Sequence, residues 1–431
     1  MSRMKKKPAE FLLALSAMVI AVCFCHTEIC GGLTLPGVPE ALAGSEEGEG
    51  PTEEREEEGT AREEYDSEGT VFDTPLNALS ACLMDAESGR VLYEKNGYQE
   101  MPMASTTKIM TCLVILENAS ADEIVTVSRY ASTMPDVQLG ITEGEQYYVG
   151  DLLYSLMLES HNDVAVALAE HVGGSVEAFC DMMTARAKSI GAYHTSFKTP
   201  NGLDADGHYT TAADLARIGS FALTNEEFVA ITNTAFHTFQ EINGKRSFTV
   251  NNKNRFLEMM DGAIGIKTGF TGKAGYCFVG GVKREDRTLV SVVLGCGWPP
   301  NKNLKWTDTT ALMEYGLENY EKQNIFEENP DIEPVAVYGG KETEVPLTCR
   351  GSLELLMRED ERVTVEYSLV SGLTAPVELG AQAGTADYYV NQELIASFPV
   401  MTEEAVEKLD LAFCLSWVLE NFSAQGAAAE R

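Results

Sequence analysis

Hydrophobic positions follow two different patterns along residues 77–325. Short apolar runs bounded by turn residues predict strands at both ends of this region, over 78–85, 90–94, 263–268, 276–282 and 288–295, and a hairpin over 236–250. Runs with helical spacing predict helices from 105 through 116 and over 152–158, 163–171, 176–190, 211–223 and 308–320, the second capped by Asp151. Strands, then helices, then strands and a helix predict one sheet whose strands come from both ends of a domain.

Beyond this region the pattern changes to short strands and turns. Strands are predicted over 334–338, 353–357, 363–369 and 386–390, which indicates a small separate β domain over 329–400. Residues 402–423 are predicted as an amphipathic helix with Val406, Leu409, Phe413 and Trp417 on one face. Its polar face is acidic, whereas helices that lie on membranes usually carry Lys or Arg there. A membrane anchor and a helix docked on the β domain or on another subunit both stay open.

The N-terminus has the features of an export signal. Three lysines at 5–7 precede the apolar run 11–25, which is short for a membrane span, and Ala41-Leu42-Ala43 is a cleavage signature. We expect a signal peptide over 1–43, with an uncleaved signal anchor as the alternative, and export of the remaining chain in both cases. Residues 44–76 are expected to form an acidic, disordered linker, because the stretch 45–69 carries twelve Asp/Glu against two Arg and has no aliphatic run to bury.

Composition narrows the functional classes. The chain has 431 residues, enough for two to three domains, and 32 Lys+Arg against 66 Asp+Glu give a net charge of −34. Nucleic-acid binding is excluded because no basic patch is available to replace phosphate counterions. The ten cysteines form no CxxC pair, which argues against a zinc ribbon or a thioredoxin motif. Seven of them remain after signal cleavage, and we expect most of these to be buried thiols.

Three short motifs carry the candidate chemistry: Ser105-Thr106-Thr107-Lys108, Ser160-His161-Asn162 and Lys267-Thr268-Gly269. In the first motif, a spacing of three at a helix start puts the Ser105 hydroxyl within reach of the Lys108 amine. A serine is a weak nucleophile until a base takes its proton, and a lysine is a useful base only when its pKa falls. Burial and a second cation, which Lys267 can supply, both lower that pKa.

The other two motifs suit substrate handling. Ser160 can relay protons between a lysine and a leaving amine, and Asn162 can hold a substrate amide and contact Lys108. Lys267 and Thr268 offer a cation and a hydroxyl to a substrate carboxylate, and Gly269 lets the ligand backbone lie close. Each motif alone is weak, but the three in this order form a motif set known from class A β-lactamases and penicillin-binding proteins.

Three stretches resemble a known family. Residues 101–111, 159–174 and 261–281 are similar to the D-alanyl-D-alanine carboxypeptidases, the low-molecular-mass penicillin-binding proteins. The resemblance covers roughly 77–325, and residues 199–216 fit it as well. It implies an α/β fold of the β-lactamase/DD-peptidase type, with an antiparallel sheet flanked by helices, a helical subdomain and a small C-terminal β domain. The β region and the terminal helix resemble that family's C-terminal domain and membrane-associating helix.

The resemblance also implies an activity and its residues. Ser105 would be the acylated nucleophile with Lys108 as its base, while Ser160, Asn162 and Lys267 complete the proton network. The substrate would lie along Lys267, Thr268, Gly269 and Phe270, and the backbone N–H groups of Ser105 and Phe270 would form the oxyanion hole. Phe270 stands where some members have His, and His161 replaces a commoner small residue. The implied substrate is a peptidoglycan stem peptide ending in D-Ala-D-Ala, with β-lactams as covalent inhibitors and no cofactor or metal.

Other activities fit the sequence less well. A class A β-lactamase needs a glutamate that activates the deacylating water, and residues 178–225 contain none. The sequence has neither the G-x-S-x-G of an elbow hydrolase nor the H-E-x-x-H of a zinc peptidase. A DD-endopeptidase, a β-lactamase-like hydrolase with weak β-lactam hydrolysis, and a non-turnover penicillin-binding sensor or scaffold stay open as alternatives. His208 lies in the similar segment, either as part of the site or as a core or surface histidine.

Overall fold

The computed structural model describes residues 74–327 and 330–428, with side chains of the last helix described as far as Leu419. The predicted signal peptide (1–43) and all but the last three residues of the predicted linker (44–76) lie outside these ranges. In the described part of the chain, no helix has both the length and the hydrophobicity to cross a membrane.

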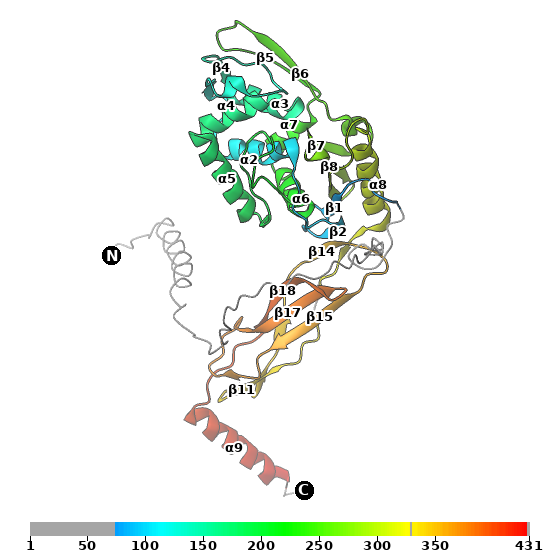
Figure 1. The fold of residues 1–431 in the computed structure, drawn as a ribbon. Helices are drawn as coiled ribbons and strands as arrows, with labels where there is room; N and C mark the ends of the chain where they lie inside the picture. The colour runs from blue at the N-terminus through cyan, green and yellow to red at the C-terminus, as the bar shows by residue number, and fades with distance from the viewer. Residues whose placement is uncertain (1–73, 328–329, 429–431) are drawn as a thin grey trace, which may run out of the picture. The chain divides into compact units, whose positions relative to one another are not determined.

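A five-stranded antiparallel sheet organises the first domain (Figure 1). Its strands are β1 (Ser80–Asp85), β2 (Val91–Lys95), β7 (Ala263–Thr271), β8 (Gly275–Arg284) and β9 (Arg287–Leu294), in the order β2-β1-β9-β8-β7. β1 pairs with β9, with Cys82 opposite Val292, so the two ends of the domain meet in the middle of the sheet. The prediction of one sheet built from both ends is confirmed, and β7 lies at an edge of that sheet.

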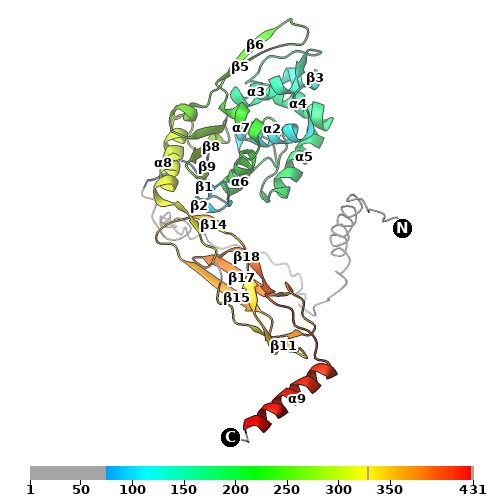
Figure 2. The ribbon, with the colours of Figure 1, turned by 180° about the vertical axis from the view of Figure 1, so that it is seen from behind.

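Helices cover both faces of the sheet, which Figures 1 and 2 show from opposite sides. One face carries the helical part: α2 (Lys108–Asn118), α3 (Val149–Leu158), α4 (Asn162–Gly173), α5 (Val176–Ser189), α6 (Ala212–Ala222) and α7 (Glu226–Asn233). There α6 packs on β1 and β9, while α8 (Leu304–Asn319) packs on β8 and β9 from the other face. Each face therefore has its own hydrophobic core, one around α2 and α4 and the other around Phe278 and Trp306.

Shorter elements connect these helices. They are the 3-10 turns η1 (Ala104–Thr107), η2 (Ala131–Thr133) and η3 (Arg255–Glu258), the strand pair β3 (Ile124–Thr126) with β4 (Gln146–Tyr148), and the hairpin of β5 (Phe236–Gln240) and β6 (Ser247–Asn251). The predicted hairpin around Asn243-Gly244 is confirmed. Gly244 has φ +70°, a conformation that favours glycine in a tight turn.

The C-terminal region is built from short strands. They are β10 (Glu321–Asn324), β11 (Val335–Tyr338), β12 (Glu344–Val345), β13 (Leu347–Cys349), β14 (Glu354–Met357), β15 (Val363–Leu369), β16 (Leu373–Thr374), β17 (Gln382–Val390) and β18 (Glu393–Thr402). They form the sheets β13-β18-β17-β15, β12-β11-β16 and β10-β14. The core of the two larger sheets contains a cluster of three aromatic rings, Phe326, Tyr388 and Phe398.

The terminal helix begins later than the sequence predicts. The helix α9 runs over Leu411–Ala428, whereas the prediction placed its start at Thr402. Thr402 ends β18 and is buried opposite Leu347, and Val406 is buried and pairs with Val377. Burial in the β domain therefore overrides the helical spacing that includes Val406 and Leu409.

Two other predicted helix starts are also wrong. Asp151 does not cap α3, which begins two residues earlier at Val149; its carboxylate lies 2.7 Å from His237 Nε2. The helix α8 begins at Leu304 rather than at Asp308, whose carboxylate accepts hydrogen bonds from Asn77 and from the backbone of Ala78. Six of the seven cysteines in the described residues are buried, as expected, and the exception is Cys414 on α9.

Candidate active site

Ser105 lies in a 3-10 turn at the start of α2. The preceding residue, Ala104, has φ +48°, a conformation that costs energy for a residue with a side chain and that often marks functional sites. The turn brings Ser105 next to Lys108, the first residue of α2, and Lys108 Nζ donates a hydrogen bond to Ser105 Oγ over 3.0 Å. The structure therefore places the Ser105 hydroxyl next to the Lys108 amine, as the sequence predicts.

The amine of Lys108 is held by two further groups. It donates to Asn162 Oδ1 over 2.9 Å and to the backbone carbonyl of Asn201. That carbonyl also accepts from Ser105 Oγ at 3.4 Å. Asn201 is a site residue that the sequence reasoning missed as an individual, although it falls within the family-like segment 199–216. The structure thus brings residues from three distant parts of the chain to one amine.

The environment of Lys108 lowers its pKa well below the usual value. Burial of the amine is the main cause, the charge of Lys267 adds to it, and Asp163 acts in the opposite direction. Lys108 is completely buried. A buried amine beside a second cation is stabilised in its neutral form, which is the form that can accept a proton from a serine.

The second motif lies in the turn between α3 and α4. Ser160 has φ +72°, which orients the turn before Asn162 begins α4. The Ser160 hydroxyl is buried and has no hydrogen-bond partner within residues 74–327 and 330–428. A buried hydroxyl without a partner costs free energy, so it indicates a group that acquires its partner when a ligand binds. The amide of Asn162 also donates to the backbone carbonyl of Pro135 over 3.2 Å.

His161 contacts Ser155 on α3 and its neighbour Glu159. It is buried, its Nδ1 lies 2.7 Å from Ser155 Oγ, and burial lowers its pKa. The adjacent Asp163 accepts backbone hydrogen bonds from residues 139–141 and so fixes the segment that passes behind the second motif. Burial and the contact with Ser155 thus accommodate the unusual residue at position 161.

The third motif lies on β7 and reaches the serine through its backbone. Lys267 is buried, and burial lowers its pKa to about 7. Its Nζ donates to the backbone carbonyl of Thr268 over 3.2 Å. Gly269 lies directly against the catalytic turn, where a Cβ atom would come within 2.9 Å of the backbone nitrogen of Ser105. Only glycine therefore allows this edge strand to approach the turn so closely.

The register of β7 and β8 places the backbone of Phe270 at the open edge of the sheet. Phe270 pairs with Tyr276. The N–H and carbonyl of Tyr276 bond instead to Gly297 and Cys296, over 3.0 Å and 2.8 Å. In an antiparallel ladder this makes Phe270 and Tyr276 a non-hydrogen-bonded pair, so the N–H of Phe270 points away from β8. A donor is thus directed outward from the strand that lies against Ser105.

A buried histidine ties the Asn201 loop to the catalytic turn. His208 Nδ1 accepts a hydrogen bond from the backbone N–H of Lys198 over 3.0 Å, so the ring proton is on Nε2, which lies 2.9 Å from Thr107 Oγ1. Burial lowers the pKa of His208 to about 4, which keeps the ring neutral at ordinary pH. His208 therefore holds together the loop and the turn and does not itself contact Ser105 in the bonds described.

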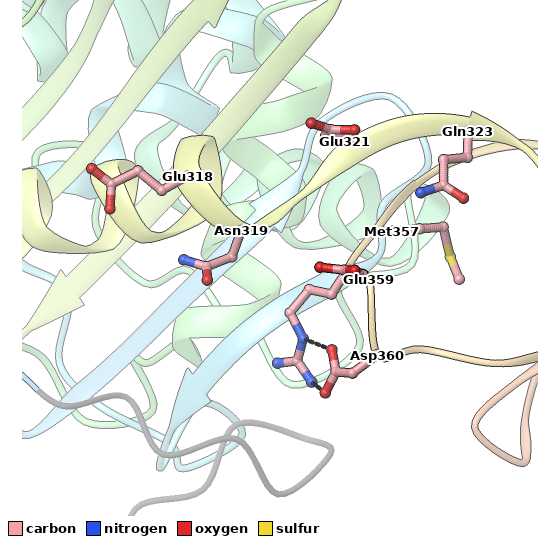
Figure 3. Close-up of a pocket in the computed structure, with 8 residues that line it drawn as sticks. Glu318, Asn319, Glu321, Gln323, Met357, Glu359 and Asp360 are labelled. Carbon is pink, nitrogen blue, oxygen red and sulfur yellow. Dashed lines mark hydrogen bonds and ion pairs between the residues drawn. The ribbon is translucent and has the colours of Figure 1, made fainter.

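One pocket in the described residues lies away from the three motifs. Figure 3 shows a pocket of about 720 Å³ between the end of α8, β10 and the end of β14, lined by Glu318, Asn319, Glu321, Gln323, Met357, Arg358, Glu359 and Asp360. Its arginine is paired with Asp360, and none of the motif residues lines it. Across the described ranges, no group of three or more His, Cys, Asp or Glu is arranged to hold a metal ion.

Comparisons with known proteins agree with this geometry. A family model described as D-alanyl-D-alanine carboxypeptidase matches residues 68–297, and a model of the C-terminal domain of penicillin-binding protein 5 matches residues 320–408. The carboxypeptidase DacF of Bacillus subtilis is 32% identical over 339 residues, which cover 77% of this chain and 86% of the relative. DacC of Escherichia coli is 32% identical over 361 residues, which cover 80% and 88%.

Solved structures give the same result. Penicillin-binding protein 5 of Haemophilus influenzae superimposes with a TM-score of 0.65 at 28% identity, covering 79% of this chain and all of that chain. The carboxypeptidase DacD of Francisella tularensis superimposes with a TM-score of 0.62 at 25% identity, covering 78% and 95%. The similarity therefore includes both the domain with the three motifs and the C-terminal β region.

Proposed function

The chain belongs to the D-alanyl-D-alanine carboxypeptidase family and is a serine-type D-Ala-D-Ala carboxypeptidase, and we propose that Ser105 carries its reaction through an acyl-enzyme. Its substrates are peptidoglycan stem peptides that end in D-Ala-D-Ala. β-Lactams inhibit enzymes of this family, and we assign their covalent attachment to the same serine.

Acylation uses the neutral amine of Lys108. Ser105 Oγ attacks the carbonyl carbon between the two terminal D-alanines, and its proton passes to Lys108 Nζ, 3.0 Å away. The carbonyl oxygen becomes negative and accepts hydrogen bonds from the backbone N–H groups of Ser105 and Phe270. The last D-alanine leaves after its amine receives a proton relayed through Ser160. This role gives the buried hydroxyl of Ser160 the partner that it lacks without substrate.

The cation and hydroxyl of the third motif bind the substrate carboxylate. Lys267 and Thr268 interact with the C-terminal carboxylate, and Asn162 orients a substrate amide while it holds Lys108 in place. Water then attacks the acyl-enzyme and releases the shortened stem peptide, with Lys108 acting again as the base. No organic cofactor or metal takes part in this sequence of steps.

The observation that carries the proposal is the set of contacts at Lys108. One fully buried amine contacts the hydroxyl of Ser105, the amide of Asn162 and the carbonyl of Asn201. This arrangement has no structural purpose that a hydrophobic side chain would not serve better, because burying an amine costs free energy. It does provide a general base beside a nucleophile.

A labelling experiment with residues 44–431 tests this function. The protein is incubated with a diacyl peptide ending in Lys-D-Ala-D-Ala and examined by mass spectrometry, with and without a β-lactam. We expect release of one D-alanine, its inhibition by the β-lactam, and a single adduct on Ser105 that Ser105→Ala abolishes. Labelling that persists in Ser105→Ala would contradict the assignment. An adduct on Ser105 without D-alanine release would indicate a sensor, a scaffold or an endopeptidase.

The enzyme works outside the cytoplasm, where its peptidoglycan substrate lies. We propose that residues 1–43 direct its export and that α9 attaches it to the outer surface of the cytoplasmic membrane. Residues 411–419 of α9 contain no charged residue, and several of their apolar side chains are exposed: Leu411, Leu415, Trp417, Val418 and Leu419. An uncharged, exposed apolar helical surface favours insertion into a lipid interface. Phe413 of the same stretch does contact the β domain, since Lys341 Nζ lies 5.6 Å from the centroid of its ring, whereas the five apolar side chains named above stay exposed.

A further inference from the structure

Phe270 exposes a large apolar side chain on β7, one residue beyond the glycine that lies against Ser105. Its relative exposure is 42%, although the preceding residue, Gly269, is buried against Ser105. The ring is not loose. It packs on the ring of its cross-strand partner Tyr276 with 4.6 Å between the ring centroids. We refer to these two rings as the Phe270–Tyr276 platform.

A buried lysine supports the platform from below. Lys305 Nζ lies 4.7 Å from the centroid of the Tyr276 ring and 4.5 Å from that of Trp306. The amine also donates to the backbone carbonyl of Lys302 over 2.8 Å. Contacts of a cation with two aromatic faces are attractive and fix the position of both rings. The exposed ring of Phe270 is therefore held in one place by a layer of buried groups.

The proposed function assigns the leaving residue of a substrate to the part of β7 that carries the platform. Side chains alternate along a strand, so Thr268 and Phe270 project from the same face of β7, about 6.8 Å apart along the strand. In the proposed function, Thr268 binds the substrate carboxylate and the N–H of Phe270 binds the scissile carbonyl oxygen. The amino acid between those two groups is the one that leaves. The binding mode of the proposed function therefore brings this amino acid near the ring of Phe270.

We propose that Phe270 is a specificity-determining residue that selects an apolar leaving amino acid. The ring offers no hydrogen bond to a polar side chain, and a polar group buried against it loses its water without compensation. An apolar side chain instead gains contact area. The platform accordingly favours apolar leaving residues, including residues bulkier than alanine, over polar ones of the same size. This inference rests on the proposed function and adds the substrate preference of that same site.

Two isosteric leaving residues test the preference. The full chain is assayed with diacyl-Lys-D-Ala-D-Leu and diacyl-Lys-D-Ala-D-Asn, whose last side chains have nearly the same shape but differ in polarity, and kcat/KM is determined for each. The wild type is expected to prefer the D-Leu peptide. In Phe270→Ser the ratio of the two kcat/KM values should fall on the order of tenfold, and in Phe270→Leu it should be largely retained.

Control variants distinguish a failure of the proposed Phe270 preference from a failure of the proposed carboxypeptidase function. Phe236→Ser removes another exposed phenylalanine, on β5 and outside the three motifs, and should leave the ratio unchanged. Lys305→Met removes the support under Tyr276 and should lower the ratio less than Phe270→Ser does. A ratio in Phe270→Ser within twofold of the wild type would overturn the inference. Failure of the wild type to release D-alanine from Lys-D-Ala-D-Ala would instead refute the proposed function.

Discussion

Gly269 on β7 and Ser105 in η1 meet backbone to backbone, although 164 positions separate them in the sequence. A Cβ atom at position 269 would lie 2.9 Å from the nitrogen of Ser105 and 3.1 Å from both Ala104 Cβ and the nitrogen of Thr106. Two of these three neighbours, the nitrogens of Ser105 and Thr106, are main-chain atoms, which cannot rotate away as a flexible side chain can. The distance between the edge strand and the nucleophile is therefore set by the missing side chain.

Because of this contact, adding one methyl group at position 269 should strongly lower the rate of acylation. Gly269→Ala should push β7 away from Ser105 and lower the rate of β-lactam acylation on the order of 100-fold, because catalytic groups tolerate little displacement. Gly272→Ala is the matched control, since a Cβ atom at Gly272 has no heavy atom within 4 Å. Stopped-flow acylation and thermal unfolding of both variants make the comparison. Equal acylation rates in the two variants would show that the close contact has no functional role.

The lowered pKa of Lys267 predicts that the rate of D-alanine release falls as the pH rises. Its pKa is about 7, so the cation to which the proposed function assigns carboxylate binding is present below pH 7 and is lost above it. The value of kcat/KM, which reports the free enzyme, should therefore decline as the pH rises through about 7. The value of kcat/KM should also decline on the acid side, because protonation of Lys108 removes the base. A pH profile of D-alanine release checks both limbs.

The variant Lys267→Arg distinguishes the contribution of Lys267 to the pH profile from that of Lys108. Lys267→Arg keeps its charge at every accessible pH, so its alkaline limb should disappear from the profile while the acid limb remains. Lys253→Arg, at an exposed position, should retain the profile of the wild type. An alkaline limb of Lys267→Arg that still has its midpoint near pH 7 would assign that limb to another group.

The lowered pKa of the buried His208 predicts that the folded protein loses stability in acid. An unfolded histidine titrates near pH 6.5, whereas burial lowers the pKa of His208 to about 4 in the folded protein. Between these values the unfolded chain takes up a proton that the folded chain does not. The free energy of unfolding should thus decrease by roughly 3 kcal/mol as the pH falls from about 6.5 to 4, and this group contributes no pH dependence above that window.

Urea unfolding at pH 7.5 and 4.5 measures the contribution of His208. His208→Gln should show a smaller difference in unfolding free energy between the two pH values than the wild type. His194→Gln changes an exposed histidine and should behave like the wild type. The same pH dependence in all three proteins would place the acid sensitivity in other groups.

The exposed face of α9 predicts binding to lipid vesicles. The double variant Leu415→Ser/Trp417→Ser should bind phospholipid vesicles at least tenfold more weakly than the full chain, since each side chain buries apolar area in the interface. Leu379→Ser removes an exposed leucine of the β domain and serves as the control. Vesicle sedimentation gives the affinities. Undiminished binding of the double variant would exclude α9 as the anchor.

Local spacing was sufficient to predict the pair at the centre of the site. Ser105 and Lys108 are three residues apart at a helix start, and helix geometry alone brings their side chains together. The sheet built from both ends could also be predicted, because its strands are short apolar runs bounded by turn residues. These features depend on side-chain type and short-range order, which a sequence displays directly.

The missed features depend on main-chain atoms and on distant packing. The carbonyl of Asn201 binds Lys108, but a backbone oxygen is common to all residues and leaves no mark in the sequence. The late start of α9 depends on Val406, which packs in the β domain although its spacing suits a helix. The outward direction of the Phe270 N–H follows from a register that only the folded hairpin defines.

The pairing of β1 with β9 also determines when the enzyme can become active. Cys82 and Val292 lie opposite each other, so the central sheet cannot close until more than two hundred intervening residues have been made. Contacts of such long sequence separation form slowly, because the entropy of loop closure opposes them. β7, which carries the third motif, joins the sheet only through β8. A nascent chain that ends before β9 consequently has its nucleophile but no completed site, and the activity arises as a late event of folding.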